Sequence, residues 1–218
     1  TFDNMSATLL GDTLYVLGGY RNGIPSCSMF SFCLSNYSGG WTEVFFPGKP
    51  RVQPVCASLF GNLYIWGGFI PGKESSVLTD GLCYQPASGQ WQVLRAPLTT
   101  EGQPLTLTGG ASVSYGDTLV ICAGGVNRDI FEDAISGRYK KVCESEYLLQ
   151  PVEWYHFNDQ LLAYDVRLGE WIRIGTPSPM LARAGASLVL FGEALFYIGG
   201  ELKPGVRTSD ICRISFQE

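Results

Sequence analysis

SATLLGDTLYVLGG, residues 6–19, consists of a short apolar strand, a Gly-polar turn, a second apolar strand and a pair of glycines. Three more segments follow the same plan: VCASLFGNLYIWGG (55–68), ASVSYGDTLVICAGG (111–125) and ASLVLFGEALFYIGG (186–200). A hairpin turn needs residues that tolerate a positive φ, and the candidate turns are Gly11-Asp12, Gly61-Asn62, Gly116-Asp117 and Gly192-Glu193. The pattern predicts four β-hairpins of one repeated design.

A tryptophan follows each of the first three glycine pairs, at Trp41, Trp91 and Trp171. A third apolar strand fits between each glycine pair and its tryptophan, so the tryptophan opens a fourth strand. The interval from Gly125 to Trp171 is about twice the two earlier intervals. We therefore expect an insertion in the third unit.

This double-glycine, tryptophan-spaced unit resembles the Kelch repeat, the four-stranded blade of an all-β propeller. Glycine lets the crowded inner backbones approach closely, and each tryptophan is expected to pack between neighbouring blades. An ordinary β-sandwich is the alternative, which four copies in phase disfavour. We expect one partial propeller domain over residues 1–218, with blades at about 1–50, 51–105, 106–182 (insertion 128–159) and 183–218.

The two ends of the chain do not complete the last blade. One strand, Asp210 to Gln217, follows the final glycine pair without a tryptophan strand, and residues 1–5 lead directly into an inner strand. We expect three full blades and three strands of a fourth. The expected source of the missing outer strand, and of about two further blades of a six-bladed ring, is sequence preceding residue 1.

Composition narrows the class of function. A net charge of −5 argues against nucleic acid as a partner, because such binding needs a basic surface. No apolar run reaches the length of a membrane span. The seven cysteines are odd in number and lack CxxC spacing, so we expect mainly unpaired, buried thiols. A single histidine, His156, argues against a metal centre such as that of Kelch copper oxidases, which needs several ligands.

The insertion has helical composition at 129–135 and at 140–149. In a blade of sequential antiparallel strands, the loop after strand two and the connection into strand one emerge on the same face. Helices there would form a lid or wall over the mouth of the propeller. The aromatic run from Trp154 to Phe157 is expected to pack the insertion onto the propeller or to line that mouth.

Two segments extend the resemblance beyond a general Kelch repeat. GGVNRDIF (124–131) and GELKPGVRT (200–208) are similar to the bacterial N-acetylneuraminate mutarotases, also called epimerases, which are six-bladed Kelch propellers. The opening TFDNM (1–5) is similar to an internal segment of that family's cyclically permuted branch. The resemblance implies an isomerase of free sialic acid that uses no cofactor, with periplasmic localisation. Seven cysteines that are largely unpaired fit a reducing compartment better.

The resemblance implies a site built on Glu201 and Arg207, which match the glutamate and arginine that family members are thought to use. Glutamate would transfer the proton during ring opening, and arginine would hold the substrate carboxylate. Both residues lie in one loop around Pro204-Gly205, whose turn brings them together, although an ion pair that only pins the loop is the alternative. Lys203 is expected to shape this loop. Four further mouth residues are candidates either for binding the sugar or for linking the blades: Arg51, Gln53, Asn127 and Arg183.

Two other functions remain open. The first is a non-catalytic propeller that binds a protein or carbohydrate partner, which is the commonest use of Kelch repeats. The second is a glycosidase, for which Asp129 and Glu201 would form the required carboxylate pair. The lid and the Glu201–Arg207 loop beside it favour the isomerase, because a protein-binding propeller needs neither the lid nor this loop. The sequence does not indicate an oligomeric state.

Overall fold

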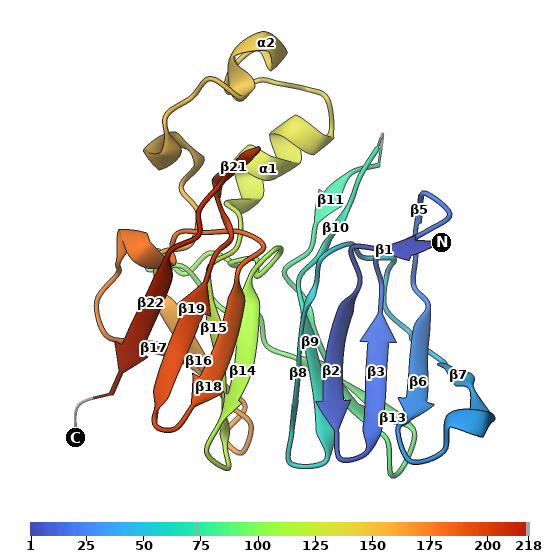
Figure 1. Cartoon of the computed structure of the whole chain (residues 1–218). Helices are drawn as coiled ribbons and strands as arrows, with labels where there is room; N and C mark the ends of the chain where they lie inside the picture. The colour runs from blue at the N-terminus through green and yellow to red at the C-terminus, as the bar shows by residue number, and fades with distance from the viewer. Residues whose placement is uncertain (73, 217–218) are drawn as a thin grey trace.

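The computed structural model describes residues 1–72 and 74–216, whose main strands form four antiparallel blade sheets placed one after another in chain order, with smaller sheets beside them (Figure 1). Three blades have four strands each and the fourth has three, with Gln217 outside the described residues. The predicted all-β class and its blade-like sheets are confirmed. Each blade follows the order predicted from the repeats, with the first strand of the hairpin innermost, and in the first three blades the tryptophan strand is outermost.

The strands of the blades have the following bounds. The first two blades contain β2 (Ser6–Leu10), β3 (Thr13–Leu17), β6 (Met29–Cys33) and β7 (Trp41–Val44), then β8 (Val55–Leu59), β9 (Asn62–Trp66), β12 (Gly81–Gln85) and β13 (Gln90–Leu94). The last two contain β14 (Ala111–Tyr115), β15 (Leu119–Ala123), β16 (Leu161–Asp165) and β17 (Glu170–Ile174), then β18 (Ser187–Phe191), β19 (Ala194–Ile198) and β22 (Ile211–Ser215). Two short 3-10 helices, η1 (Tyr37–Gly39) and η3 (Pro179–Leu181), lie in connections.

The inner strands β2, β8, β14 and β18 contact one another in sequence. Serine hydroxyls link them directly: Ser58 Oγ donates to the Leu9 carbonyl (2.6 Å) and Ser112 Oγ to the Cys56 carbonyl (3.1 Å). Ser114 Oγ donates to the Ser58 carbonyl (2.5 Å). These bonds satisfy carbonyls that an isolated blade would leave unpaired at its inner edge.

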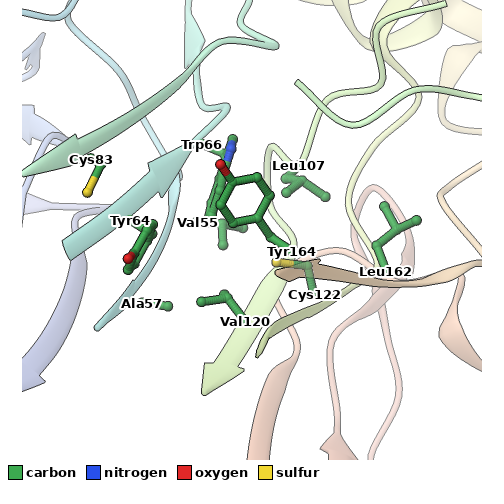
Figure 2. Packing of buried hydrophobic residues seen from close by; sticks show 10 residues of the cluster. All are labelled: Val55, Ala57, Tyr64, Trp66, Cys83, Leu107, Val120, Cys122, Leu162 and Tyr164. Carbon is green, nitrogen blue, oxygen red and sulfur yellow. The ribbon is translucent and has the colours of Figure 1, made fainter. Parts of the chain in front are cut away.

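Aromatic side chains fill the space between blades, as Figure 2 shows for the second and third blades. Trp66 is fully buried and packs edge-to-face on Trp171, with ring centroids 5.0 Å apart. Trp171 Nε1 donates to the Arg95 carbonyl (2.9 Å) of the preceding blade, and Trp91 Nε1 donates to the Phe45 carbonyl (3.0 Å). Inter-blade packing is therefore confirmed for Trp91 and Trp171, whereas Trp41 is 53% exposed.

The hairpin turns agree with the glycine pattern, with one correction. The turn between β8 and β9 is Phe60-Gly61 and not Gly61-Asn62, because Leu59 pairs with Asn62. Both turn residues have positive φ, 55° and 77°. This is the geometry of a two-residue hairpin turn whose twist matches that of the strands.

Short strand pairs extend the blades on one face, where Figure 1 shows β10–β11 and β21 rising beside the insertion. These elements are β1 (Phe2–Asp3), β4 (Tyr20–Arg21) and β5 (Ile24–Pro25), β10 (Phe69–Ile70) and β11 (Ser76–Val77), and β20 (Glu201–Lys203) and β21 (Val206–Arg207). The insertion of the third blade starts from the equivalent position and lies above the sheets. We call the side carrying these elements the mouth face.

The insertion contains α1 (Arg128–Ile135), α2 (Glu144–Tyr147) and the 3-10 helix η2 (Val152–Tyr155). The first predicted helix is correct to one residue, but the helix predicted at 140–149 is wrong over most of its length. The Lys141 N–H donates to Asp133 Oδ2 (2.9 Å), so the chain before Glu144 folds back onto α1. None of the helices in the described part of the chain is long and apolar enough to cross a membrane.

Candidate functional site: the β20–β21 hairpin at the mouth

Backbone hydrogen bonds join the four blades at the start of their inner strands. The Gln53 N–H donates to the Asn4 carbonyl (3.1 Å), Gly109 to Gln53 (3.1 Å) and Gly185 to Gly109 (2.7 Å). All four residues have positive φ, between 52° and 70°. They occupy one structural position repeated in each blade, and this ladder forms the inner rim of the mouth face.

In each blade, the residue directly after the two glycines forms a backbone hydrogen bond with the residue that precedes the rim residue. In the last blade that residue is Glu201, whose N–H donates to the Ala184 carbonyl (2.7 Å) while its carbonyl accepts from the Ala184 N–H (3.0 Å). Glu201 opens β20, and a bulge follows it before Lys203. Its backbone is therefore held against the rim, and its side chain remains 32% exposed.

The β20–β21 hairpin brings Arg207 opposite Glu201, where the two residues are register partners. Gly205, with φ of 77°, supplies the positive φ of the turn that the Pro-Gly pair predicted. Arg207 Nε donates to Glu201 Oε1 over 3.3 Å, and the Arg207 side chain is 83% exposed. The structure thus joins the two residues that the resemblance singled out.

The contact leaves binding capacity on both side chains. Arg207 uses only Nε, and within residues 1–72 and 74–216 neither terminal nitrogen of its guanidinium has a hydrogen-bond partner. A guanidinium presents paired N–H groups that match the two oxygens of a carboxylate. Chemically, the pair combines an anion-binding fork with a carboxylate able to exchange protons at the same position.

Arg51 and Arg183 do not reach the mouth, which corrects their assignment as sugar-binding residues. Their exposed fractions are 0% and 1%. Arg51 donates to the Gly67 carbonyl (3.0 Å) and to Asp80 Oδ2 (2.9 Å). Arg183 Nη1 donates to the carbonyls of Gly199 and Asp210, both at 3.0 Å. Each side chain therefore closes the glycine corner of its own blade.

Asn127 is also engaged in local structure. Its Oδ1 accepts the N–H groups of Asp129 and Ile130, both at 3.1 Å, and so caps the N-terminus of α1. Gln53, by contrast, is exposed on the rim, and its Nε2 donates to Asn4 Oδ1 (3.0 Å). Of the four supporting candidates, only Gln53 presents a side chain beside the inner rim. Asn4, which precedes its inner strand as Gln53 does, was not among the candidates for binding the sugar.

A cavity of about 650 Å³ lies under the base of the insertion, apart from Glu201 and Arg207. Asn127, Asp129 and His156 are among its lining residues, and Leu202 lines it from the last blade. Asp129 accepts from Arg128 Nε at 2.8 Å. Because the cavity excludes Glu201, it does not support the glycosidase pair. No three His, Cys, Asp or Glu side chains of the described chain are grouped to hold a metal ion.

Comparison with known proteins gives one family. The model of the N-acetylneuraminate epimerase family matches residues 1–218. The N-acetylneuraminate epimerase of Haemophilus influenzae (strain 86-028NP) is 32% identical over 216 residues, covering 94% of this chain and 55% of that protein. The corresponding protein of Yersinia enterocolitica serotype O:8 / biotype 1B (strain NCTC 13174 / 8081) is 33% identical over 189 residues, covering 80% and 46%.

The solved structure of YjhT superposes with a TM-score of 0.82 at 27% identity, over 99% of this chain and 63% of that one. This neighbour is a Kelch-type propeller, so the predicted propeller class is confirmed. The chain spans about half the length of the curated relatives it matches. The number of blades in the ring stays a prediction.

Proposed function

Because the chain belongs to the N-acetylneuraminate epimerase family, we propose that the protein interconverts the α- and β-anomers of free N-acetylneuraminate at Glu201 and Arg207. The observation that carries the proposal is the contact between these two side chains on the mouth face, 3.3 Å apart. It supports catalysis at the anomeric carbon, because this substrate carries a carboxylate on the carbon that reacts.

Arg207 binds that carboxylate through the two terminal nitrogens that Glu201 leaves free. A bidentate pair of this kind fixes both position and orientation. The anomeric carbon is bonded directly to the bound carboxylate, so its hydroxyl group lies within reach of Glu201. Positioning a reacting group in this way contributes to the rate by removing the entropic cost of bringing it to the base.

Glu201 acts as the general base and then the general acid. Its carboxylate takes the proton of the anomeric hydroxyl, the carbonyl of the open-chain form develops, the bond from the anomeric carbon to the ring oxygen breaks, and solvent water protonates the ring oxygen. Rotation of the open chain presents the other carbonyl face. Reclosure reverses the proton transfers, and Glu201 returns its proton to the new anomeric hydroxyl.

We also propose a periplasmic location, following the resemblance to the family. The observation against it is that all seven cysteines are unpaired, which is typical of a reducing compartment. Osmotic-shock fractionation of bacteria that produce the full-length protein tests this location. Recovery with periplasmic marker enzymes supports it, and recovery with cytoplasmic markers contradicts it.

The function is tested by following the α/β ratio of freshly dissolved N-acetylneuraminate by proton NMR, with and without full-length protein. We expect equilibration faster than the spontaneous rate. The methyl ester of the same sugar, which lacks the carboxylate charge, should show little acceleration. Absence of acceleration for the free acid would contradict the isomerase and leave the binding-module alternative. Equal acceleration of acid and ester would contradict carboxylate anchoring.

A further inference from the structure

Lys203 connects the hairpin of the candidate site to the insertion. Its Nζ donates to the carbonyls of Gln150 (2.6 Å) and Leu148 (3.1 Å). Leu148 is the C-terminal cap residue of α2, where helix carbonyls have no partner within the helix. The ammonium group thus satisfies two acceptors on a segment more than fifty positions away in sequence.

The other end of the insertion is attached to the second blade. Phe131 of α1 packs edge-to-face on Phe69 of β10, with ring centroids 5.1 Å apart. Glu132 Oε2 accepts the N–H of Val77 in β11 (3.2 Å). The insertion therefore spans from the mouth hairpin of the second blade to that of the fourth.

Between these two attachments the insertion has an aromatic core of its own. Tyr147 contacts Tyr139, Trp154 and Tyr155 through edge-to-face ring pairs. Tyr155 is buried, and its hydroxyl donates to the Tyr147 carbonyl. A segment packed in this way transmits its position from one end to the other, because closely packed side chains resist independent displacement.

We propose that Lys203 is a positioning residue, which ties the insertion to the β20–β21 hairpin and so holds Glu201 and Arg207 in their reactive arrangement. The inference rests on the proposed function. The hairpin is only a few residues long, and its bulge lies between Glu201 and Lys203. Near the rim, the Ala184–Glu201 pair and the bond from the Thr208 N–H to the Gly200 carbonyl (2.9 Å) hold the base of the hairpin. The two bonds of Lys203 are the side-chain hydrogen bonds that the described residues of the hairpin make to the insertion.

The test compares Lys203→Met, Lys203→Arg and a matched control, Lys140→Met, in the full-length protein. Lys140 is an exposed lysine of the same insertion, and its side chain makes no hydrogen bond or ion pair with the described residues. Two readouts are needed: hydrogen exchange of residues 144–150 and 201–207, and kcat and KM for mutarotation. The thermal unfolding midpoint is recorded for each variant to show that it is folded.

We expect Lys203→Met to accelerate exchange in both segments and to lower kcat about tenfold to hundredfold, with a smaller change in KM, because small displacements of reacting groups have effects of this size. Lys203→Arg should restore most of the protection from exchange and most of kcat, since a guanidinium can donate to the same carbonyls. Lys140→Met should behave as the wild type.

Unchanged exchange of 144–150 in Lys203→Met would contradict the attachment. Accelerated exchange with a wild-type kcat would contradict the positioning role. If the wild-type protein does not accelerate mutarotation, the proposed function fails, and positioning for that reaction fails with it. The exchange data then decide separately whether Lys203 attaches the insertion to the hairpin.

Discussion

Arg207 and Glu201 face each other as register partners across the β20–β21 hairpin, and Arg207 Nε donates to Glu201 Oε1 over 3.3 Å. The contact involves one nitrogen of the guanidinium. An ion pair that served only to pin the hairpin would gain more from a two-nitrogen contact, and exposed pairs contribute little to stability in any case. The one-sided geometry therefore favours a second ligand for Arg207 over a purely structural pair.

The first prediction concerns Arg51. Substitution by alanine should lower the free energy of unfolding by about 2 to 3 kcal/mol, because the Gly67 carbonyl loses its buried donor and Asp80 loses its ion-pair partner. Mutarotation by the folded protein should be nearly unaffected. Denaturant unfolding and the NMR assay measure the two quantities. The control is Lys49→Ala, at an exposed neighbouring position. A stable variant with reduced substrate affinity would instead return Arg51 to the binding site.

The second prediction compares two glycines with positive φ. A Cβ at Gly124 (φ 70°) would collide with the Tyr197 hydroxyl and the Arg183 carbonyl, whereas a Cβ at Gly116 (φ 56°) would meet no atom within 4 Å. Gly116→Ala should cost about 1 kcal/mol of unfolding free energy through backbone strain alone. Gly124→Ala should cost at least about 3 kcal/mol, because backbone and packed side chains must shift. Similar unfolding midpoints for the two variants would contradict close packing at the glycine pair.

The third prediction concerns thiol reactivity and its pH dependence. Burial raises the pKa of Cys83 to about 11 and also raises the pKa of Cys122, whereas Cys27 and Cys143 are exposed. The thiolate is the reactive form, so a raised pKa lowers reactivity at any pH below it. Alkylation at pH 8, followed by mass spectrometry, should label Cys27 and Cys143 quickly, and Cys83 and Cys122 only after unfolding. Labelling of Cys122 in the native protein at a similar rate would contradict this packing.

The repeated segments were sufficient to predict the sheets, because the alternation of apolar strands and glycine turns is a local property. The hairpin turn of the second blade was misplaced by one residue, since both Phe60 and Gly61 adopt positive φ and only glycine is recognisable for it. The second helix was overextended because the Asp133 carboxylate, eight positions earlier in the chain, takes the Lys141 N–H. Helical composition does not report such a competing contact.

Arg51 and Arg183 were misassigned because sequence places a residue at the mouth edge without showing where its side chain points. The sequence nevertheless contained a signal that these two arginines have partners within their own blades. An aspartate stands directly before the third strand in the same two blades, at Asp80 and Asp210, and these aspartates are the arginines' partners. The first and third blades carry neither arginine nor aspartate at these positions. The family resemblance singled out Glu201 and Arg207, and their contact could be predicted because a short Pro-Gly turn joins them.

The most direct test of the proposed site is the rate of N-acetylneuraminate anomer exchange, measured by proton NMR in the full-length protein with Glu201→Gln, Arg207→Ala and Arg21→Ala. Arg21 is an exposed arginine in the corresponding hairpin of the first blade and serves as the matched control. Loss of the general acid–base group should reduce the catalysed rate by at least about a hundredfold, with a similar loss for Arg207→Ala and none for Arg21→Ala. Wild-type rates in Glu201→Gln and Arg207→Ala would contradict the assignment of catalysis to this pair.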